Sequence, residues 1–81
     1  MLSKLKGANV VAGTRRVTRA LQEDKISAVY LAVDADLFIA RPIRDLCKTK
    51  NVPVIEAQSM VALGEACGLP VKTAVAGMLR D

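Results

Sequence analysis

Short apolar runs alternate along the chain with longer amphipathic segments. The runs are rich in valine, isoleucine and alanine and are bounded by glycine, proline or polar residues, a pattern that predicts β-strands. Four strands are expected, at Asn9–Ala12, Ser27–Val33, Val52–Ala57 and Thr73–Leu79. The second run is apolar at nearly every position, which is typical of a central strand that is buried on both faces.

The amphipathic segments predict helices. The expected ranges are Leu2–Lys6, Thr14–Asp24, Asp36–Lys50 and Met60–Cys67. Thr14 and Ser59 are expected to act as N-caps, because a hydroxyl group there can accept a hydrogen bond from the first turn. Gly68 is expected to end the last helix, and Pro42 must lie in the first turns of its helix or kink it.

This alternation of strands and helices predicts an α/β fold, a three-layer α/β/α sandwich around a small, four-stranded mixed sheet. With 81 residues, the chain is expected to form one domain, residues 1–81. Hydrophobic residues make up 52% of the sequence, and only Tyr30 and Phe38 are aromatic. The expected core is therefore compact and aliphatic.

Two cysteines, Cys47 and Cys67, fall on expected core faces and are interpreted as structural thiols. A secreted domain of this size usually has four or more cysteines, so the sequence favours a reducing, cytoplasmic compartment. No signal peptide is recognised at the start. The longest apolar runs are far shorter than the ~20 residues that cross a membrane, so no membrane partner is expected.

The positive charge is concentrated near the start of the chain. Residues 1–25 contain six basic and two acidic side chains, whereas residues 26–81 contain six of each. The whole net charge of +4 therefore lies in the first 25 residues. One-sided charge of this kind indicates a polyanionic partner, although a solvated face without a partner remains an alternative.

Catalytic chemistry has little support in the sequence. The chain has no histidine, which removes the commonest general base, and two isolated cysteines cannot complete a zinc site. Asp34 and Asp36 follow a predicted strand, where either metal ligands or helix caps are common, and capping is favoured. We therefore expect no enzyme activity, no cofactor, no metal and no small-molecule substrate.

The segment Gly13-Thr14-Arg15-Arg16 is the best candidate for a binding site. A strand that ends at glycine and leads into a helix exposes backbone N–H groups at the positive end of the helix dipole, where anions bind. Helical spacing places Arg15 and Arg19 opposite the apolar stripe, with Arg16 to one side. Guanidinium groups suit phosphates and the O6/N7 edge of guanine, and the lack of aromatic platforms favours structured RNA over single strands.

The sequence resembles the kink-turn-binding ribosomal proteins of the L-seven-Ae and L-thirty-e group, from about Val10 to Met78. The first matching segment, residues 12–21, is similar to the Gly-Thr-Asn-Glu-x-Thr-Lys segment of that family. Further matches are residues 29–36, the Leu-Cys-x-x-Lys-Asn-Val-Pro segment at 46–53, and Ala-Leu-Gly-Glu-Ala-Cys-Gly at 62–68. The short length is similar to the bacterial branch of the family.

The resemblance implies an RNA-binding protein that recognises kink-turns, which are sharply bent RNA helices with tandem G·A pairs, and that is ribosomal-protein-like or ribosome-associated. A cytoplasmic location and a monomeric state are expected as well. By position, Gly13 and Thr14 would approach the RNA backbone, and Arg15, Arg16 and Arg19 would face guanines and phosphates. Asp36 would help to hold a flipped-out base. Apolar cover for the bases of the internal loop would come from Leu69, Pro70 and Val71.

Several alternatives stay open. The family pattern has Asn-Glu where this chain has Arg15-Arg16, and arginine cannot accept the hydrogen bonds that glutamate accepts from guanine. The segment Leu69–Val71 could be an ordinary loop packed on the core as readily as an exposed patch. The chain could also be a protein-interaction module on the same fold, or a fragment of an enzyme that binds anions or nucleotides.

Overall fold

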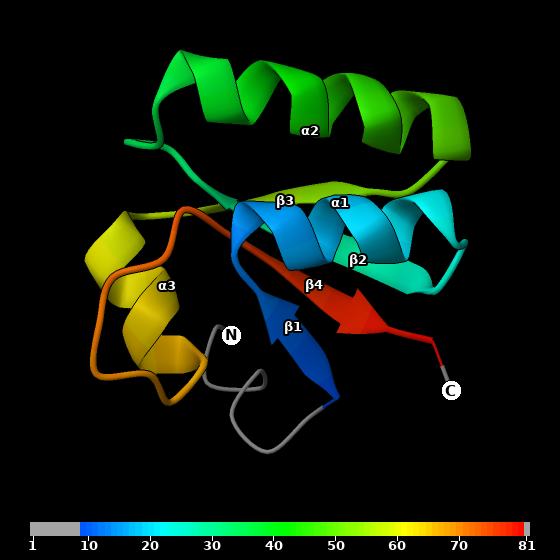
Figure 1. Cartoon of the computed structure of the whole chain (residues 1–81). Coiled ribbons are helices and arrows are strands. Elements are labelled where there is room, and N and C mark those ends of the chain that lie inside the picture. Colours follow the sequence, from blue (N-terminus) through cyan, green and yellow to red (C-terminus); the bar gives the residue numbers. More distant parts are fainter. Residues whose placement is uncertain (1–8, 81) are drawn as a thin grey trace.

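A four-stranded mixed sheet forms the middle layer of the molecule (Figure 1). The computed structural model describes residues 9–80, so the predicted helix Leu2–Lys6 lies outside the described residues. The elements along the chain are β1 (Val10–Ala12), α1 (Thr14–Gln22), β2 (Ile26–Ala32), α2 (Leu37–Lys50), β3 (Val54–Ala57), α3 (Met60–Ala66) and β4 (Val75–Leu79). Their order and type agree with those predicted from the sequence.

The strand order in the sheet is β1-β4-β2-β3. The last strand, β4, is antiparallel to both of its neighbours, and Gly77 lies opposite Val11 of β1 and Val29 of β2. β2 and β3 are parallel, with Tyr30 opposite Ile55, and α2 makes the crossover between them. The mixed four-stranded sheet predicted from the sequence is thus confirmed.

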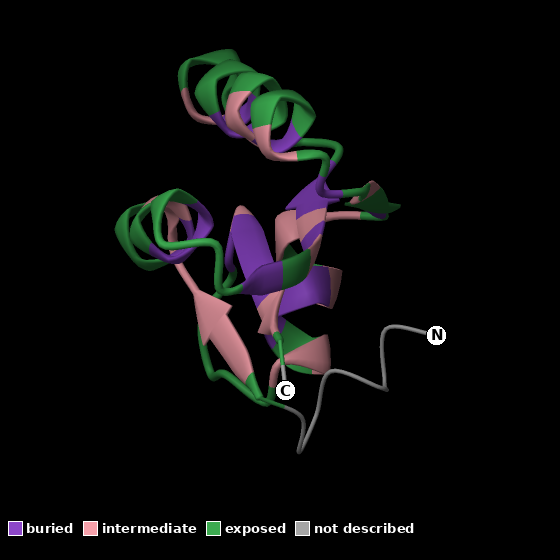
Figure 2. Cartoon of the chain, turned by 90° about the vertical axis from the view of Figure 1, so that its right-hand side faces the viewer, coloured by how far each residue is buried: buried purple, intermediate pink, exposed green. Residues whose placement is uncertain are grey.

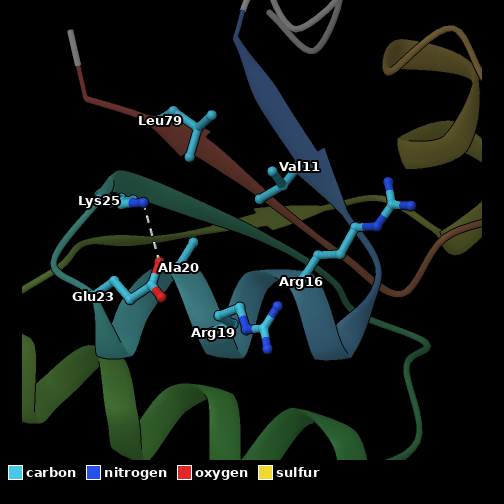
Figure 3. A pocket seen from close by; sticks show the side chains of 7 residues that line it. All are labelled: Val11, Arg16, Arg19, Ala20, Glu23, Lys25 and Leu79. Atoms are coloured by element: carbon cyan, nitrogen blue, oxygen red, sulfur yellow. Dashed lines mark ion pairs between the residues drawn. The ribbon is translucent and has the colours of Figure 1, made fainter.

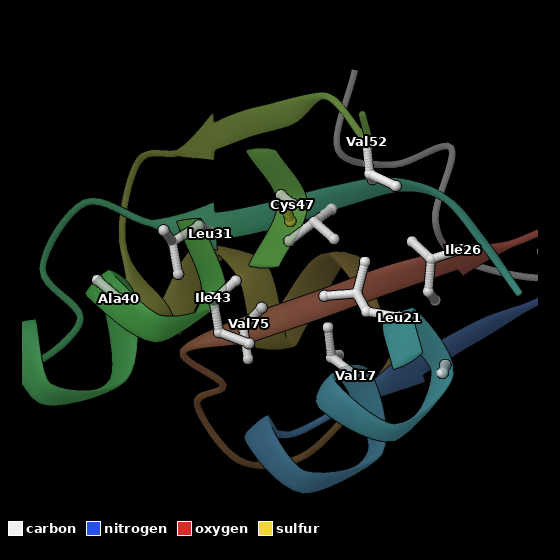
Figure 4. Packing of buried hydrophobic residues seen from close by; sticks show 11 residues of the cluster. Val17, Leu21, Ile26, Leu31, Ala40, Ile43, Cys47, Val52 and Val75 are labelled. Carbon is white, nitrogen blue, oxygen red and sulfur yellow. The ribbon is translucent and has the colours of Figure 1, made fainter. Parts of the chain in front are cut away.

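Helices cover both faces of this sheet, which gives the predicted three layers. The larger apolar cluster packs α1 and α2 against one face and includes Leu21, Leu31, Ile43 and Val75 (Figure 4). A smaller cluster packs α3 against the other face around Leu63. Buried positions accordingly follow the sheet and the inner sides of the helices (Figure 2).

The start of α1 differs from the sequence prediction. Gly13, and not Thr14, occupies the N-cap position, and no side chain caps the helix. Gly13 has a φ of 99°, a conformation that a residue with a Cβ rarely adopts, and it makes the sharp turn from β1 into the helix. Because the turn is completed at the glycine, Thr14 already belongs to the first turn of α1, and its predicted capping role is wrong.

Five strand ends differ from the predicted ones. β1 begins at Val10 instead of Asn9, and β2 begins at Ile26 instead of Ser27. Val33 lies beyond β2 in a turn, with 58% of its surface exposed. The Val52 N–H donates to the Cys47 carbonyl at the end of α2, so β3 begins only at Val54. The Thr73 N–H donates to the Met60 carbonyl at 3.0 Å, which delays the start of β4 to Val75.

Candidate nucleic-acid interface

The sheet brings three connecting segments to one of its ends. The Gly13 N–H donates to the Val75 carbonyl at 3.0 Å, and the Ala32 N–H donates to the Ala74 carbonyl at 2.9 Å. The turn after β1, the turn after β2 and the segment before β4 are therefore neighbours. In Figure 1 the starts of α1 and α2 and the orange segment before β4 all lie toward the same side. Every predicted site residue except Arg19 belongs to these segments or to the first turns of the helices that follow them, and Arg19 lies one turn further along α1.

The N-terminus of α1 is open to an anion. No acidic side chain lies in its first turn, and none caps it. The first N–H groups of a helix have no partner within the helix, so they remain available to an external acceptor. A Cβ added at Gly13 would meet no atom within 4 Å, which means that a ligand can approach the backbone closely here.

Three arginines lie along the exposed side of α1, two in its first turn and Arg19 in its last turn. Arg15, Arg16 and Arg19 are all exposed, and together they line one hollow of about 320 Å³. Arg16 and Arg19 also border a second hollow of about 270 Å³, whose apolar wall includes Val11 and Leu79 (Figure 3). The structure thus places Arg15, Arg16 and Arg19 on one surface, as the helical spacing predicted.

The acidic residues near α1 do not neutralise these arginines. Glu23 pairs with Lys25 at 3.2 Å, and Asp24 pairs with Lys50 at 3.2 Å, both at the far end of the helix. The remaining ion pair among residues 9–80 joins Arg44 to Glu56. Arg15, Arg16 and Arg19 thus take part in none of the ion pairs of residues 9–80, and Glu23 borders the second hollow together with Arg16 and Arg19.

The two aspartates after β2 both accept hydrogen bonds from the backbone at the starts of helices. The Asp36 carboxylate accepts a hydrogen bond from the Phe38 N–H at 2.8 Å and caps α2. The Asp34 carboxylate accepts one from the Met60 N–H at 2.8 Å, at the start of α3. The expected capping role is therefore confirmed for Asp36, whereas the N-cap of α3 is Ser59 and Asp34 adds a hydrogen bond to the first residue of that helix. Asp36 is exposed at the same end of the sheet as the arginines.

The segment Leu69–Val71 is fixed by its backbone while its side chains face solvent. The Leu69 N–H donates to the Gly64 carbonyl at 2.9 Å. Leu69 is 37% exposed, Val71 is 65% exposed, and Pro70 is also exposed. Of the two alternatives left open by the sequence, the structure therefore favours an exposed apolar patch over a loop whose side chains pack on the core.

Three exposed apolar residues at this end were not among the predicted site residues. Val33 is 58% exposed, Leu37 64% and Phe38 91%. The sequence did contain a signal for Phe38, because the buried residues of α2, Ala40, Ile43 and Cys47, place it on the opposite side of a helical wheel.

Comparison with known proteins agrees with this geometry. The model of the ribosomal protein L7Ae/L30e/S12e/Gadd45 family matches residues 2–81. The chain belongs to this family. Membership of the L7Ae/L30e family confirms the resemblance inferred from the four sequence segments, and the family is a non-enzymatic one, as expected from the sequence.

Individual relatives of this L7Ae/L30e chain are similar over most of their length. The RNA-binding protein GK0100 of Geobacillus kaustophilus is 40% identical over 76 residues, which cover 94% of this chain and 93% of the relative. The RNA-binding protein YbxF of Geobacillus stearothermophilus is 38% identical with the same coverage. The structure of a 15.5kD RNA binding protein from Giardia lamblia superposes with a TM-score of 0.91 at 28% identity, covering 99% of this chain and 71% of that one.

No helix within residues 9–80 is both long enough and apolar enough to cross a membrane.

Proposed function

We propose that this protein binds structured RNA, and that its target is a kink-turn. One observation carries the proposal: the N-terminus of α1 is uncapped, and Arg15, Arg16 and Arg19 line one exposed hollow along that helix without an ion pair among residues 9–80. The names of the relatives as RNA-binding proteins support it. We propose further that the chain acts as one domain and as a monomer in the cytoplasm, in association with ribosomes.

In this proposal the start of α1 enters the groove of the RNA. The backbone at Gly13 and Thr14 approaches a phosphate, which accepts hydrogen bonds from the first N–H groups of the helix. Arg15, Arg16 and Arg19 donate to phosphates and to the O6/N7 edge of guanine. Phosphate contacts set the position of the RNA, whereas contacts to base edges determine which RNA is preferred.

The other two segments complete the proposed interface. Asp36 uses one carboxylate oxygen to cap α2, and its exposed carboxylate is a hydrogen-bond acceptor for a base that has left the helix stack. Leu69, Pro70 and Val71 cover neighbouring bases with apolar surface. Because Arg15-Arg16 can only donate hydrogen bonds, we propose that electrostatic attraction contributes more to affinity here than in relatives with Asn-Glu.

The test compares two RNA duplexes that differ only at the bend. One is a kink-turn with tandem G·A pairs, and the other has Watson–Crick pairs in their place. We expect the kink-turn to bind at least about tenfold more tightly, a difference of about 1.4 kcal/mol, at a stated salt concentration. Equal affinity for both duplexes would contradict kink-turn recognition and leave a general RNA-binding protein, and no binding to either would refute RNA binding by this site.

A further inference from the structure

The start of α2 presents an apolar surface that the core does not use. Phe38 is 91% exposed and Leu37 is 64% exposed, and they are neighbours in the first turn of the helix. The other aromatic residue of the chain, Tyr30, is half-buried in β2 against α3. Phe38 is thus the aromatic side chain that a ligand can reach.

The position of Phe38 is well fixed despite its exposure. The Asp36 carboxylate accepts a hydrogen bond from the backbone N–H of Phe38, which holds the first turn of α2. The next turns are anchored in the core by Ala40, Ile43 and Cys47 on the other side of the helix. A ring on a rigid helix start loses little conformational entropy when it binds, which suits a contact platform.

Phe38 lies on the same part of the surface as the arginines of α1. Both helices cover the same face of the sheet, and they run side by side from the same end of it (Figure 1). Arg15 and Phe38 are each the second residue of their helix, and each lies opposite the buried side of that helix. Packed helices are about 8–10 Å apart, so one ligand can span both residues.

Phe38 has charged neighbours of both signs, since the exposed Asp36 carboxylate bonds to its backbone N–H and Arg41 follows it on α2. Arg41 is exposed, takes no part in the ion pairs of residues 9–80, and lies one turn beyond Phe38 on the same side of α2. Asp45 is a further turn away from the helix start. Cations are thus present on both of the neighbouring helices, Arg41 on α2 and the arginines on α1, and they suit the phosphates near a base at Phe38.

We infer that Phe38, supported by Leu37, is a stacking platform for an unpaired base of the bound RNA, and that Arg41 contacts the phosphate of that nucleotide. This inference rests on the proposed function and adds a contact that is separate from α1, Asp36 and the loop before β4. Every base has a π-face, so stacking on Phe38 increases affinity for RNAs with an unpaired nucleotide at this place, whatever its identity.

The first experiment measures affinity for two kink-turns, one with normal unpaired nucleotides and one with abasic sites in their place. The proteins are the wild type, Phe38→Ala and a matched control, Val61→Ala, which changes a residue that is 57% exposed on α3. We expect Phe38→Ala to weaken binding roughly tenfold on the normal RNA and to have no effect on the abasic RNA. Val61→Ala should leave both affinities unchanged, and thermal unfolding should confirm that all three proteins are folded.

A second experiment uses the absence of tryptophan from the chain. In Phe38→Trp the single indole lies at the proposed platform, and stacking on a base should quench its fluorescence when the normal kink-turn is added. Quenching should be much smaller with the abasic RNA. The control Val61→Trp should show no quenching with either RNA.

The outcomes separate this inference from the proposed function. If Phe38→Ala binds the kink-turn as tightly as wild type and Phe38→Trp shows no quenching, the stacking platform is refuted while kink-turn binding stands. The surface around Phe38 would then be assigned to a protein partner. A loss of affinity that is equal on both RNAs would also overturn base stacking. Failure of the wild-type protein to bind either kink-turn would overturn both.

Discussion

Arg19 is the residue that best separates electrostatic from structural effects on α1. Its side chain is exposed, takes part in no ion pair within the described residues 9–80, and lies in the last turn of the helix. Its replacement therefore disturbs neither the turn at Gly13 nor the core. Arg15 and Arg16, by contrast, lie within the first turn, where a substitution also changes the helix N-terminus.

We predict that Arg19→Ala weakens RNA binding and reduces the slope of log affinity against log salt by about one unit, the value for one lost phosphate contact. The measurement is a salt titration of binding to a kink-turn. Lys48→Ala provides the matched control, because Lys48 is also exposed but lies in the last turn of α2. An unchanged slope for Arg19→Ala would remove Arg19 from the proposed interface.

The two free thiols differ in accessibility. Cys47 is fully buried in the larger core cluster, whereas Cys67 is half-buried beside α3. Burial raises the pKa of both thiols by desolvation, so little thiolate is present in the folded protein. We predict that N-ethylmaleimide at about pH 8 modifies Cys67 faster than Cys47, as measured by mass spectrometry. In urea both should react at similar rates, and faster labelling of Cys47 in the folded state would contradict its burial.

The same pKa shift predicts a pH dependence of stability. A thiol whose pKa is higher in the folded than in the unfolded state contributes stability that is lost as pH rises above about 9. The Cys47→Ala protein has no thiol at this position, so it does not lose this stability as pH rises, although the substitution leaves a small cavity that lowers its stability at every pH. The difference in free energy of unfolding between wild type and Cys47→Ala should therefore narrow between about pH 8 and pH 10 in urea titrations. A constant difference would show that Cys47 does not titrate on unfolding.

Some features of single residues could be predicted from the sequence and others could not. The spacing of Val17, Ala20 and Leu21 correctly placed the arginines on the outer side of α1, because helical periodicity is a local property. The capping role of Thr14 did not follow, since the N-cap position depends on the backbone turn at Gly13. The exposure of Phe38 was also missed, because an aromatic residue in an apolar run normally indicates core.

At the scale of elements, α3 holds the segment before β4 through a close approach at Gly64. A Cβ placed on Gly64 would lie 2.2 Å from the Val71 carbonyl oxygen, closer than any real contact. Only glycine leaves room for the backbone of this segment. The exposed positions of Leu69 and Val71 therefore depend on a residue of the neighbouring helix.

We predict that Gly64→Ala destabilises the protein by about 1–3 kcal/mol, because the segment or the helix must shift to relieve the overlap. The same shift should weaken RNA binding if Leu69 and Val71 cover bases. Urea unfolding measures the first effect, and Val61→Ala on the exposed side of α3 should change stability by less than about 0.5 kcal/mol. Full stability of Gly64→Ala would show that the segment is not constrained by α3.

Asp36 combines a cap with a proposed RNA contact, and two substitutions separate them. Asp36→Ala removes the hydrogen bond to the Phe38 N–H and should cost about 1 kcal/mol of stability. Asp36→Asn keeps a capping oxygen, because asparagine caps about as well as aspartate. We predict that Asp36→Asn is as stable as wild type in thermal unfolding but has a different affinity for the kink-turn. Identical RNA affinity for Asp36→Asn would assign the carboxylate to capping alone.

The type and order of elements were predictable, whereas several of their ends were not. Periods of apolar residues identified each helix and strand of the described chain, and Ser59 was correctly expected to cap α3. The start of β4 depends on the hydrogen bond between Thr73 and Met60 of α3, and the start of β3 depends on the bond between Val52 and Cys47 at the end of α2. Such contacts leave no periodic signal.

For the whole molecule, the strand order concentrates stability in the middle of the sheet. β2 and β4 each have two neighbouring strands, whereas β1 is an edge strand of three residues. We predict that backbone amides in β2 and β4 exchange with deuterium only on global unfolding, while those of β1 exchange sooner through local opening. Exchange followed by NMR tests this, and equal protection of β1 and β2 would contradict it.

The strand order itself could not be read from the sequence. Alternating elements predicted a mixed sheet, but the insertion of β4 between β1 and β2 depends on pairing between distant segments, for example Val11 with Gly77. The end of the sheet at which Gly13, Asp36 and the segment before β4 meet follows from this order. The sequence thus indicated which residues are candidates for the site, and the structure was needed to show that they lie at one end of the sheet.

This central place of β4 has a consequence for synthesis on the ribosome. β1 pairs only with β4, and the Gly13 N–H bonds to the Val75 carbonyl. A nascent chain that has been translated only as far as α3 therefore has no partner for its first strand and no fixed turn before α1. We expect Arg15, Arg16 and Arg19 to reach their native arrangement only after the last strand has been translated.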